Sequence, residues 1–266
     1  IRSVLLCVVV AAVLLVSVAT VYAGIVAVKL INEDFEDGSV VDSGGRVYGN
    51  ALIVTSGYGK VLALGSGGGG VEFALIDYVS PKNLTVTVDT RNVDVMYIHL
   101  INESEYDVLN SDLAGDWESS LVAPGYVIGY DTVSGNLYFG YSVDGVNTRI
   151  VLMIPVVPQD LDNVSVVIDQ SGTVIFRGSG QYLYAYCCIG LVIPEIPVRY
   201  VVIGGREGFI DNISVVHYVY VPEENSAAAD IDVYLGGEAE PVEFYYLLLP
   251  FVVPISLVIG LAWEKR

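Results

Sequence analysis

The chain has 266 residues, of which 53% are hydrophobic and 16% are charged. This composition excludes a disordered chain, and the length excludes a small domain that needs disulfides to make up for a thin core. The net charge of −19 repels phosphate groups, which argues against nucleic-acid binding.

The first 23 residues form an apolar segment. From Val4 to Ala23 the chain carries no charge, and about 20 helical residues are enough to cross a bilayer core of about 30 Å. Arg2 and the small residues before Gly24 also fit a secretory signal. We therefore expect residues 1–23 to be either a signal peptide or an N-terminal transmembrane helix.

An acidic stretch, "INEDFEDGSVVDSGG", follows at residues 31–45. It holds five carboxylates within ten residues, at Glu33, Asp34, Glu36, Asp37 and Asp42. From residue types alone, this stretch can be a catalytic cluster, a metal site or a solvated edge.

Residues 24–220 alternate between apolar and polar side chains at period two. In "NLTVTVDT", Leu84, Val86 and Val88 share one face of the predicted strand. The segments "VMYIHLI" and "NVSVVID" repeat the pattern, and Gly-, Asn- and Asp-rich turns separate such runs. No amphipathic helix lies between them, so the sequence predicts an all-β antiparallel two-sheet sandwich with an apolar helix at each terminus.

Four motifs in order carry a family resemblance: "NEDFEDG", "GYGKVLALGSGGGGVEF", "DNVSVVIDQSGTVIFRGSG" and "VVIGGREGFIDNISVVHY". Together they resemble the concanavalin A-like lectin/glucanase jelly roll in its laminin G-like form, over about residues 31–220. The resemblance implies that the first and last strands lie side by side. It also implies that acidic groups on these strands can share a structural Ca²⁺, for which Glu36, Asp37, Asp42 and Asp211 are the matching positions. The alternative is that Asp42 caps a turn and the other acids are solvated edge charges.

Catalysis finds little support in the sequence. Glycosidases of the resembled fold carry Glu-x-Asp-x-Glu on one strand, and this spacing does not occur in the chain. Glu103, Glu105 and Asp107 alternate in another order, and we interpret them as a solvated strand end or loop. His99 and His217 have no Cys or His at metal-ligand spacing, so we interpret both as structural residues on outward faces. We therefore expect no enzymatic activity.

Tyrosines supply the predicted ligand site. Tyr182, Tyr184 and Tyr186 alternate in "QYLYAYCC", which places three rings on one strand face where sugar rings can stack. A ladder of rings that only stabilises the sheet is the alternative. The sequons at Asn83, Asn102 and Asn163 predict glycosylation of an extracellular surface, whereas a fourth, at Asn212, reads as strand interior.

The C-terminal part divides into three segments. Residues 221–243 are acidic and small, which predicts a stalk. Residues 244–263 are apolar with flanking Tyr and Trp, which predicts a transmembrane helix, and residues 264–266 read as a cytoplasmic tail because of Lys265 and Arg266. The segment between the two apolar segments carries 9 basic and 30 acidic residues, a net charge of −21, and we expect it to lie outside the cell.

The leading hypothesis is a membrane-anchored cell-surface binding or adhesion module for glycans or a neighbouring surface protein. Membrane lipid is the expected partner of the terminal helices. A structural subunit of a surface layer, virion or pilus-like filament, with self-assembly through the apolar amino terminus, is the second hypothesis. An anchored glycoside hydrolase is the third.

Overall fold

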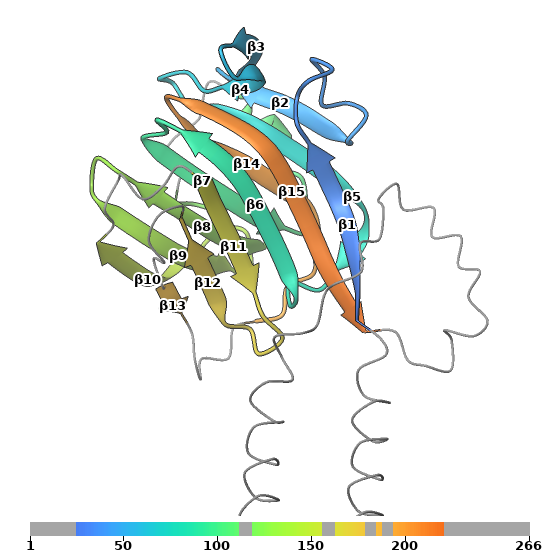
Figure 1. Ribbon diagram of the computed structural model, residues 1–266. Helices are drawn as coiled ribbons and strands as arrows, with labels where there is room; N and C mark the ends of the chain where they lie inside the picture. The colour runs from blue at the N-terminus through green and yellow to red at the C-terminus, as the bar shows by residue number, and fades with distance from the viewer. Residues whose placement is uncertain (1–24, 112–118, 156–162, 179–184, 188–193, 221–266) are drawn as a thin grey trace, which may run out of the picture.

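A computed structural model describes residues 25–111, 119–155, 163–178, 185–187 and 194–220. Figure 1 shows two β-sheets packed face to face. The strands are β1 (Ile25–Glu33), β2 (Gly45–Gly49), β3 (Leu52–Ser56), β4 (Gly59–Ala63), β5 (Gly69–Val79), β6 (Leu84–Arg91), β7 (Val95–Ile101), β8 (Gly125–Asp131), β9 (Asn136–Ser142), β10 (Arg149–Pro155), β11 (Asn163–Ile168), β12 (Val174–Arg177), β13 (Ala185–Cys187), β14 (Val198–Arg206) and β15 (Phe209–Tyr220). One short helix, α2 (Tyr106–Leu109), accompanies them.

The eight-stranded sheet has the order β13-β12-β11-β6-β15-β4-β3, with β1 paired to β15. The seven-stranded sheet has the order β10-β9-β8-β7-β14-β5-β2. All pairings between these strands are antiparallel. The predicted all-β antiparallel sandwich is therefore confirmed, and so is the adjacency of the first and last strands, because β1 pairs with β15 over Glu33 to Ile25.

The core lies between the two sheets and follows the predicted alternation. Leu84, Val86 and Val88 of β6 point into it, and their neighbours on the same strand are half-buried. Val164 and Val166 of β11 do the same. Period-two strands bury one face because successive side chains point to opposite sides of the sheet.

Strand β7 departs from this pattern. Met96, Ile98 and Leu100 face the core as predicted. The alternate residues Tyr97 and His99 lie on the outward face, as predicted for His99, yet every residue of β7 is buried. The reason is a segment that crosses the outer face of the seven-stranded sheet, described below.

No helix among the described residues is long and apolar enough to cross a membrane. The two predicted membrane segments, residues 1–23 and 244–263, and the predicted stalk, residues 221–243, lie outside the described residues.

Candidate functional site

Residues 102–124, here called the strap, join the neighbouring strands β7 and β8. The strap does not turn back directly. Its helix α2 contacts β2 at the far edge of the seven-stranded sheet, and β14 and β5 lie between β7 and β2. Three strand spacings of about 4.8 Å correspond to roughly 14 Å. The strap, of which residues 112–118 are not described, therefore crosses the outer face of the sheet.

Glu105 fastens the strap to the sheet. Its Oε2 accepts a hydrogen bond of 2.6 Å from Nδ1 of His99 on β7. Its Oε1 accepts from the backbone N–H groups of Val122 and Ala123, at 2.7 and 3.1 Å, on the returning limb of the strap. Its own N–H donates to Oε2 of Glu72 on β5, at 2.8 Å. One fully buried residue thus joins two strands and both limbs of the strap.

Glu72 is the second buried acid, and its side chain is 1% exposed. Besides the N–H of Glu105 it accepts hydrogen bonds from Arg46 Nη2, at 2.6 Å, and Ser104 Oγ, at 2.7 Å. Arg46 Nη2 also donates to Ser104 Oγ at 2.9 Å, and its guanidinium lies 4.2 Å above the centre of the Tyr106 ring. Every group that faces the two carboxylates is a donor, the arrangement that stabilises buried ionised acids.

Two tyrosines lie flat on the sheet under the strap. The hydroxyls of Tyr48 on β2 and Tyr97 on β7 are 2.8 Å apart. A Cβ at Gly204 would come within 2.2 Å of the Tyr48 hydroxyl and within 2.7 Å of the Tyr97 hydroxyl, so only glycine leaves room for the rings. Burial raises the pKa of Tyr48 well above its ordinary value, and the Tyr97 hydroxyl and the two acids add to this.

His99 also lies under the strap, on the outer face of the seven-stranded sheet. Its ring lies 4.9 Å from that of Tyr97. Its Nε2 is buried and has no hydrogen-bond partner among the described residues. A carboxylate at Nδ1 is what orients a histidine in many catalytic and metal sites. Here no third His, Cys, Asp or Glu in the described part of the chain completes a metal site.

Sequence reasoning interpreted Glu105 as part of a solvated strand end or loop, and the solvated placement is wrong. It interpreted His99 as a structural residue on an outward face, and His99 lies on the outward face of β7 but is buried by the strap. His99 and Glu105 are 0% exposed, and Glu72 was not singled out at all. The six-residue separation of His99 and Glu105 was visible in the sequence. Their pairing with Glu72 depends on the strap folding back over β5, a long-range event that periodicity does not encode.

The same outer face is open further along β5. Residues that alternate outward after Glu72 are Ala74, Ile76 and Tyr78, and Ile76 and Tyr78 are each 62% exposed. Tyr200 of β14 pairs with Ala74 and is half-buried. The Arg199 guanidinium lies 5.7 Å from the centre of the Tyr78 ring. We call Ala74, Ile76, Tyr78 and Tyr200 the open face. Strand β2 pairs with β5 only as far as Phe73, which is why this part of β5 has no neighbour on that side among the described strands.

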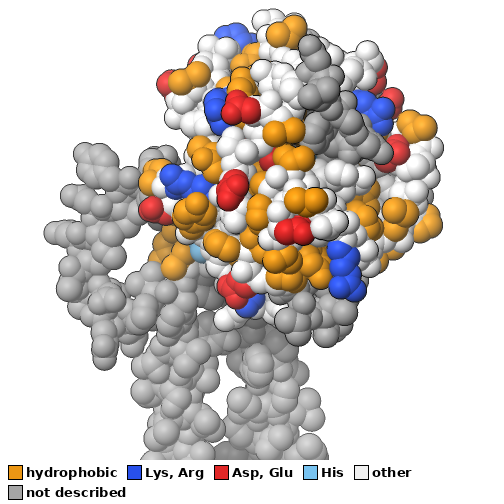
Figure 2. Space-filling view, turned by 180° about the vertical axis from the view of Figure 1, so that it is seen from behind, with side chains coloured by type: hydrophobic (Ala, Val, Ile, Leu, Met, Phe, Trp, Pro, Cys, Tyr) orange, Lys and Arg blue, Asp and Glu red, His pale blue; other side chains and the backbone are white. Residues whose placement is uncertain are grey.

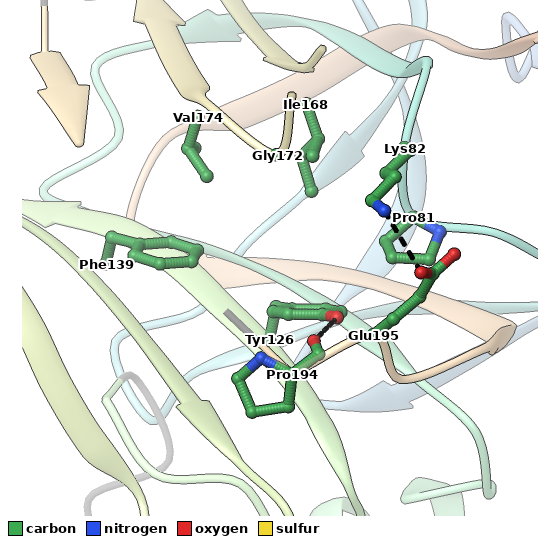
Figure 3. Close-up of a pocket in the computed structure, with 9 residues that line it drawn as sticks. All are labelled: Pro81, Lys82, Tyr126, Phe139, Ile168, Gly172, Val174, Pro194 and Glu195. Carbon is green, nitrogen blue, oxygen red and sulfur yellow. Dashed lines mark hydrogen bonds and ion pairs between the residues drawn. The ribbon is translucent and has the colours of Figure 1, made fainter. Parts of the chain in front are cut away.

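A small pocket lies at one end of the sandwich (Figure 3). Its volume is about 290 Å³, including open space at its mouth, and it is lined by Pro81, Lys82, Tyr126, Phe139, Ile168, Gly172, Val174, Pro194 and Glu195. Lys82 Nζ pairs with Glu195 at 3.1 Å. The Tyr126 hydroxyl donates to the carbonyl of Pro194 and accepts from the N–H of Ile196 at 2.8 Å. Since the polar groups bond one another, the pocket offers a ligand little beyond apolar contact.

The four positions expected to hold Ca²⁺ do not form a ligand set. No three His, Cys, Asp or Glu side chains among the described residues could hold a metal ion. Glu36 accepts the N–H of Lys60 at 3.2 Å, Asp37 accepts the N–H of Ser39 at 2.7 Å, and Asp42 is exposed. Burial raises the pKa of Asp211. Glu36 and Asp37 thus accept hydrogen bonds from backbone N–H groups, and the residues present do not fit the ion.

Glu33, the last residue of β1, was interpreted as an edge charge. It is instead buried, and it accepts hydrogen bonds from the N–H of Phe35 at 2.7 Å and from Ser43 Oγ at 2.6 Å. Asp34 is exposed and accepts the N–H of Glu36 at 3.1 Å. The acidic stretch at residues 31–45 therefore shapes its own loop.

The remaining predicted positions are mostly not tested. Tyr182 and Tyr184 lie outside the described residues, and Tyr186 lies in β13 without a described side chain. Asn83 and Asn102 are half-buried, and Asn163 begins β11. Asn212 lies within β15 as expected, but it is exposed at a β-bulge with φ of 48°. Glycosylation stays a prediction.

Comparison with known proteins identifies no family. No family model and no curated protein matches the chain. Similar solved structures include the Ca²⁺-bound exoplasmic/lumenal domain of VIP36, with 13% identity, 73% of this chain and 90% of that chain covered, and a TM-score of 0.49.

The legume lectin-like domain from Entamoeba histolytica is another similar structure, with 11% identity, coverage of 72% and 97%, and a TM-score of 0.47. The globular domain of T. cruzi calreticulin gives 11% identity, coverage of 71% and 87%, and a TM-score of 0.44. At these identities and TM-scores, no residue role transfers from those proteins to this chain.

Proposed function

We propose that the chain is a non-catalytic glycan-binding module, displayed at the cell surface, that binds its ligand on the open face. The observation that carries the proposal is the exposure of two residues of β5: Ile76 and Tyr78 are each 62% exposed on the outer face of the seven-stranded sheet, where β5 is irregularly paired with β14. Exposed rings on a sheet face give a sugar ring an apolar surface to stack on. Figure 2, which views the molecule from behind, shows hydrophobic side chains interspersed with acidic and basic ones on that side.

The absence of catalysis is supported by the state of the two buried acids. A glycosidase needs one acid and one base or nucleophile in an open cleft, flanking the scissile bond. Glu72 and Glu105 are instead covered by the strap, and each side chain already accepts three hydrogen bonds. This arrangement favours a structural role for both acids.

Anchoring is proposed from the sequence. The apolar segments 1–23 and 244–263, with Arg2, Lys265 and Arg266 at their outer flanks, favour residues 24–243 outside the cell. Protease added to intact cells should cleave within residues 24–243 and leave Lys265 and Arg266 protected. Labelling of the carboxyl terminus from outside would overturn this orientation.

A glycan array with the full chain in mild detergent tests the binding function. We expect wild type to bind, and Tyr78→Ala to bind roughly tenfold more weakly because it removes a stacking ring. Tyr58→Ala is the matched control, since Tyr58 is 66% exposed and carries an arginine, Arg91, 4.0 Å above its ring at another part of the surface.

Three outcomes decide the proposal. Selective loss in Tyr78→Ala supports the open face. Binding that is equal in wild type and in both variants rejects the open face as the binding site and leaves the tyrosine row at residues 182–186 as the predicted site. The absence of any bound glycan rejects the glycan-binding function.

A further inference from the structure

Arg46 stands at the boundary between the strap and the open face, and its side chain is 49% exposed. One nitrogen, Nη2, holds it to the fold through Glu72 and Ser104. Its Nε and Nη1 atoms have no hydrogen-bond partner in the described part of the chain. The guanidinium therefore keeps unused donors on its solvent side.

The strap fixes this guanidinium in place. Ser104 bonds it from one side, and the ring of Tyr106 lies 4.2 Å from it. Between these two residues, Glu105 is anchored to β5 and β7. An arginine held in this way has already lost most of its rotamer freedom, so a ligand that binds it does not have to order a free side chain.

The surroundings favour a negative group at this point despite the acidic domain. Glu72 is buried and already paired with Arg46, and the four residues of the open face are uncharged; the exposed acid nearest to them in the chain is Asp77, between Ile76 and Tyr78 on β5. Arg199 lies at the far end of the row, over Tyr78. The exposed strap acids Glu103 and Asp107 make no ion pair with Arg46. Charges further away are screened within about 8 Å at physiological salt.

We propose that the ligand of the open face is a carboxylate-bearing glycan, one containing uronic acid units, and that Arg46 binds its carboxylate. The inference rests on the proposed glycan-binding function and adds the ligand class. Glu72, beside Arg46, pairs with Val202, and Val79, next to Tyr78, pairs with Val198. The two ends of the row are therefore separated by four residues of β14, or about 13 Å. A ligand that contacts both Arg46 and Tyr78 is therefore an oligosaccharide.

Lysine cannot replace arginine in this role. A guanidinium bonds Glu72 through one nitrogen and presents the others, whereas a lysine has a single nitrogen. In Arg46→Lys that nitrogen is expected to remain with the buried carboxylate of Glu72, which preserves the fold and removes the donors for the ligand. Arg149→Lys is the matched control, because Arg149 is an exposed arginine on β10.

The test uses a uronic acid oligosaccharide and its carboxyl-reduced counterpart of the same length, titrated into the full chain in mild detergent. We expect wild type and Arg149→Lys to bind the acidic form at least tenfold more tightly than the reduced form. In Arg46→Lys the preference should fall below about threefold, with binding of the reduced form unchanged. Thermal melting of each variant checks that the fold is kept.

The outcomes separate this inference from the proposed function. Equal affinity of wild type for both ligands overturns the carboxylate assignment and leaves glycan binding standing. Full preference in a folded Arg46→Lys overturns the role of Arg46. Failure of wild type to bind either ligand, or any glycan on the array, overturns both proposals. The comparison of the two ligands on wild type needs no substitution, so it decides the ligand class even where a variant does not fold.

Discussion

Two halves of one strand face contrast in an unexpected direction. On the outward side of β5, the charged residue Glu72 is 1% exposed, whereas the apolar residue Ile76 and the aromatic residue Tyr78 are each 62% exposed. The usual distribution would place the carboxylate in water and the apolar groups inside. The strap covers the first half and leaves the second half open.

The contrast shows that partners, not polarity alone, decide burial in this domain. Glu72 and Glu105 are buried where each side chain meets three donors, which offsets the cost of removing a charge from water. Ile76 and Tyr78 stay exposed because the described chain provides nothing to cover them. A covered charge network is therefore a structural feature, and an open apolar row is a candidate contact surface.

A substitution that breaks the hydrogen bonds under the strap should have the largest effect on the free energy of unfolding. In Glu105→Gln, an NH₂ group replaces one carboxylate oxygen. It faces either the two strap N–H groups, where donors oppose donors, or His99, whose Nδ1 can accept only after the ring proton moves to Nε2. We expect a loss of about 3–5 kcal/mol in the free energy of unfolding. Denaturant titration measures it, and amide hydrogen exchange should rise at residues 119–124. Glu103→Gln, at an exposed neighbour, should change stability by less than about 0.5 kcal/mol; similar losses in both variants would contradict the fastening role.

The second prediction concerns Tyr126, a buried tyrosine away from the strap whose hydroxyl makes two hydrogen bonds. Tyr126→Phe leaves the carbonyl of Pro194 and the N–H of Ile196 without their hydroxyl partner, and we expect a loss of about 1–3 kcal/mol. Burial raises the pKa of Tyr126 to about 12. Because this folded pKa lies above the unfolded value of about 10, the hydroxyl's contribution is complete below pH 10 and is lost as the pH rises toward 12.

The control for this prediction is the pH profile. Urea unfolding at about pH 8 and about pH 11 should show a steeper loss in wild type than in Tyr126→Phe. Equal slopes in the two proteins would show that Tyr126 ionises as freely in the folded state as in the unfolded chain.

Substitution in the open half should barely change stability. Ile76→Ser removes an exposed side chain, and we expect a change within about 0.5 kcal/mol. Phe73→Ala is the matched comparison on the same strand, because Phe73 is fully buried in the core and its truncation should cost about 3–5 kcal/mol. A large loss in Ile76→Ser would mean that another part of the chain covers the open face.

A small effect of the opposite sign, a gain in stability, is expected at a buried acid with poor partners. Asp211 is 7% exposed, and burial raises its pKa, with the charges of Asp89 and Glu36 acting in the same direction. A folded pKa above the unfolded value means that ionisation costs stability, so stability rises as the pH falls through the folded pKa. Asp211→Asn should therefore raise the melting temperature at neutral pH by about 1–2 °C.

The same variant tests the calcium site once more. Without a metal, wild type should melt at the same temperature in EDTA and in added Ca²⁺. A rise with Ca²⁺ that disappears in Asp211→Asn would restore the calcium site, since a ligand bound only by the folded state stabilises it.

The sequence by itself determined the class of fold and much of the core. Alternation in "NLTVTVDT" and "NVSVVID" identified the inward faces of β6 and β11, because a strand's two faces follow directly from residue order. The family resemblance added that β1 and β15 are neighbours, and the antiparallel pairing of Ile25 with Tyr220 confirms this. It also suggested calcium ligands, which the described residues do not assemble.

Only the tertiary structure decided what covers the outer face. His99, Glu105 and Glu72 come from β7, the strap and β5, and their hydrogen bonds exist only after the strap crosses three strand spacings. Likewise, Ile76 and Tyr78 follow the same alternation as Glu72, and their exposure depends on where β2 and the strap end. Local periodicity tells which side of a strand a residue faces, but not whether another part of the chain comes to lie over that side.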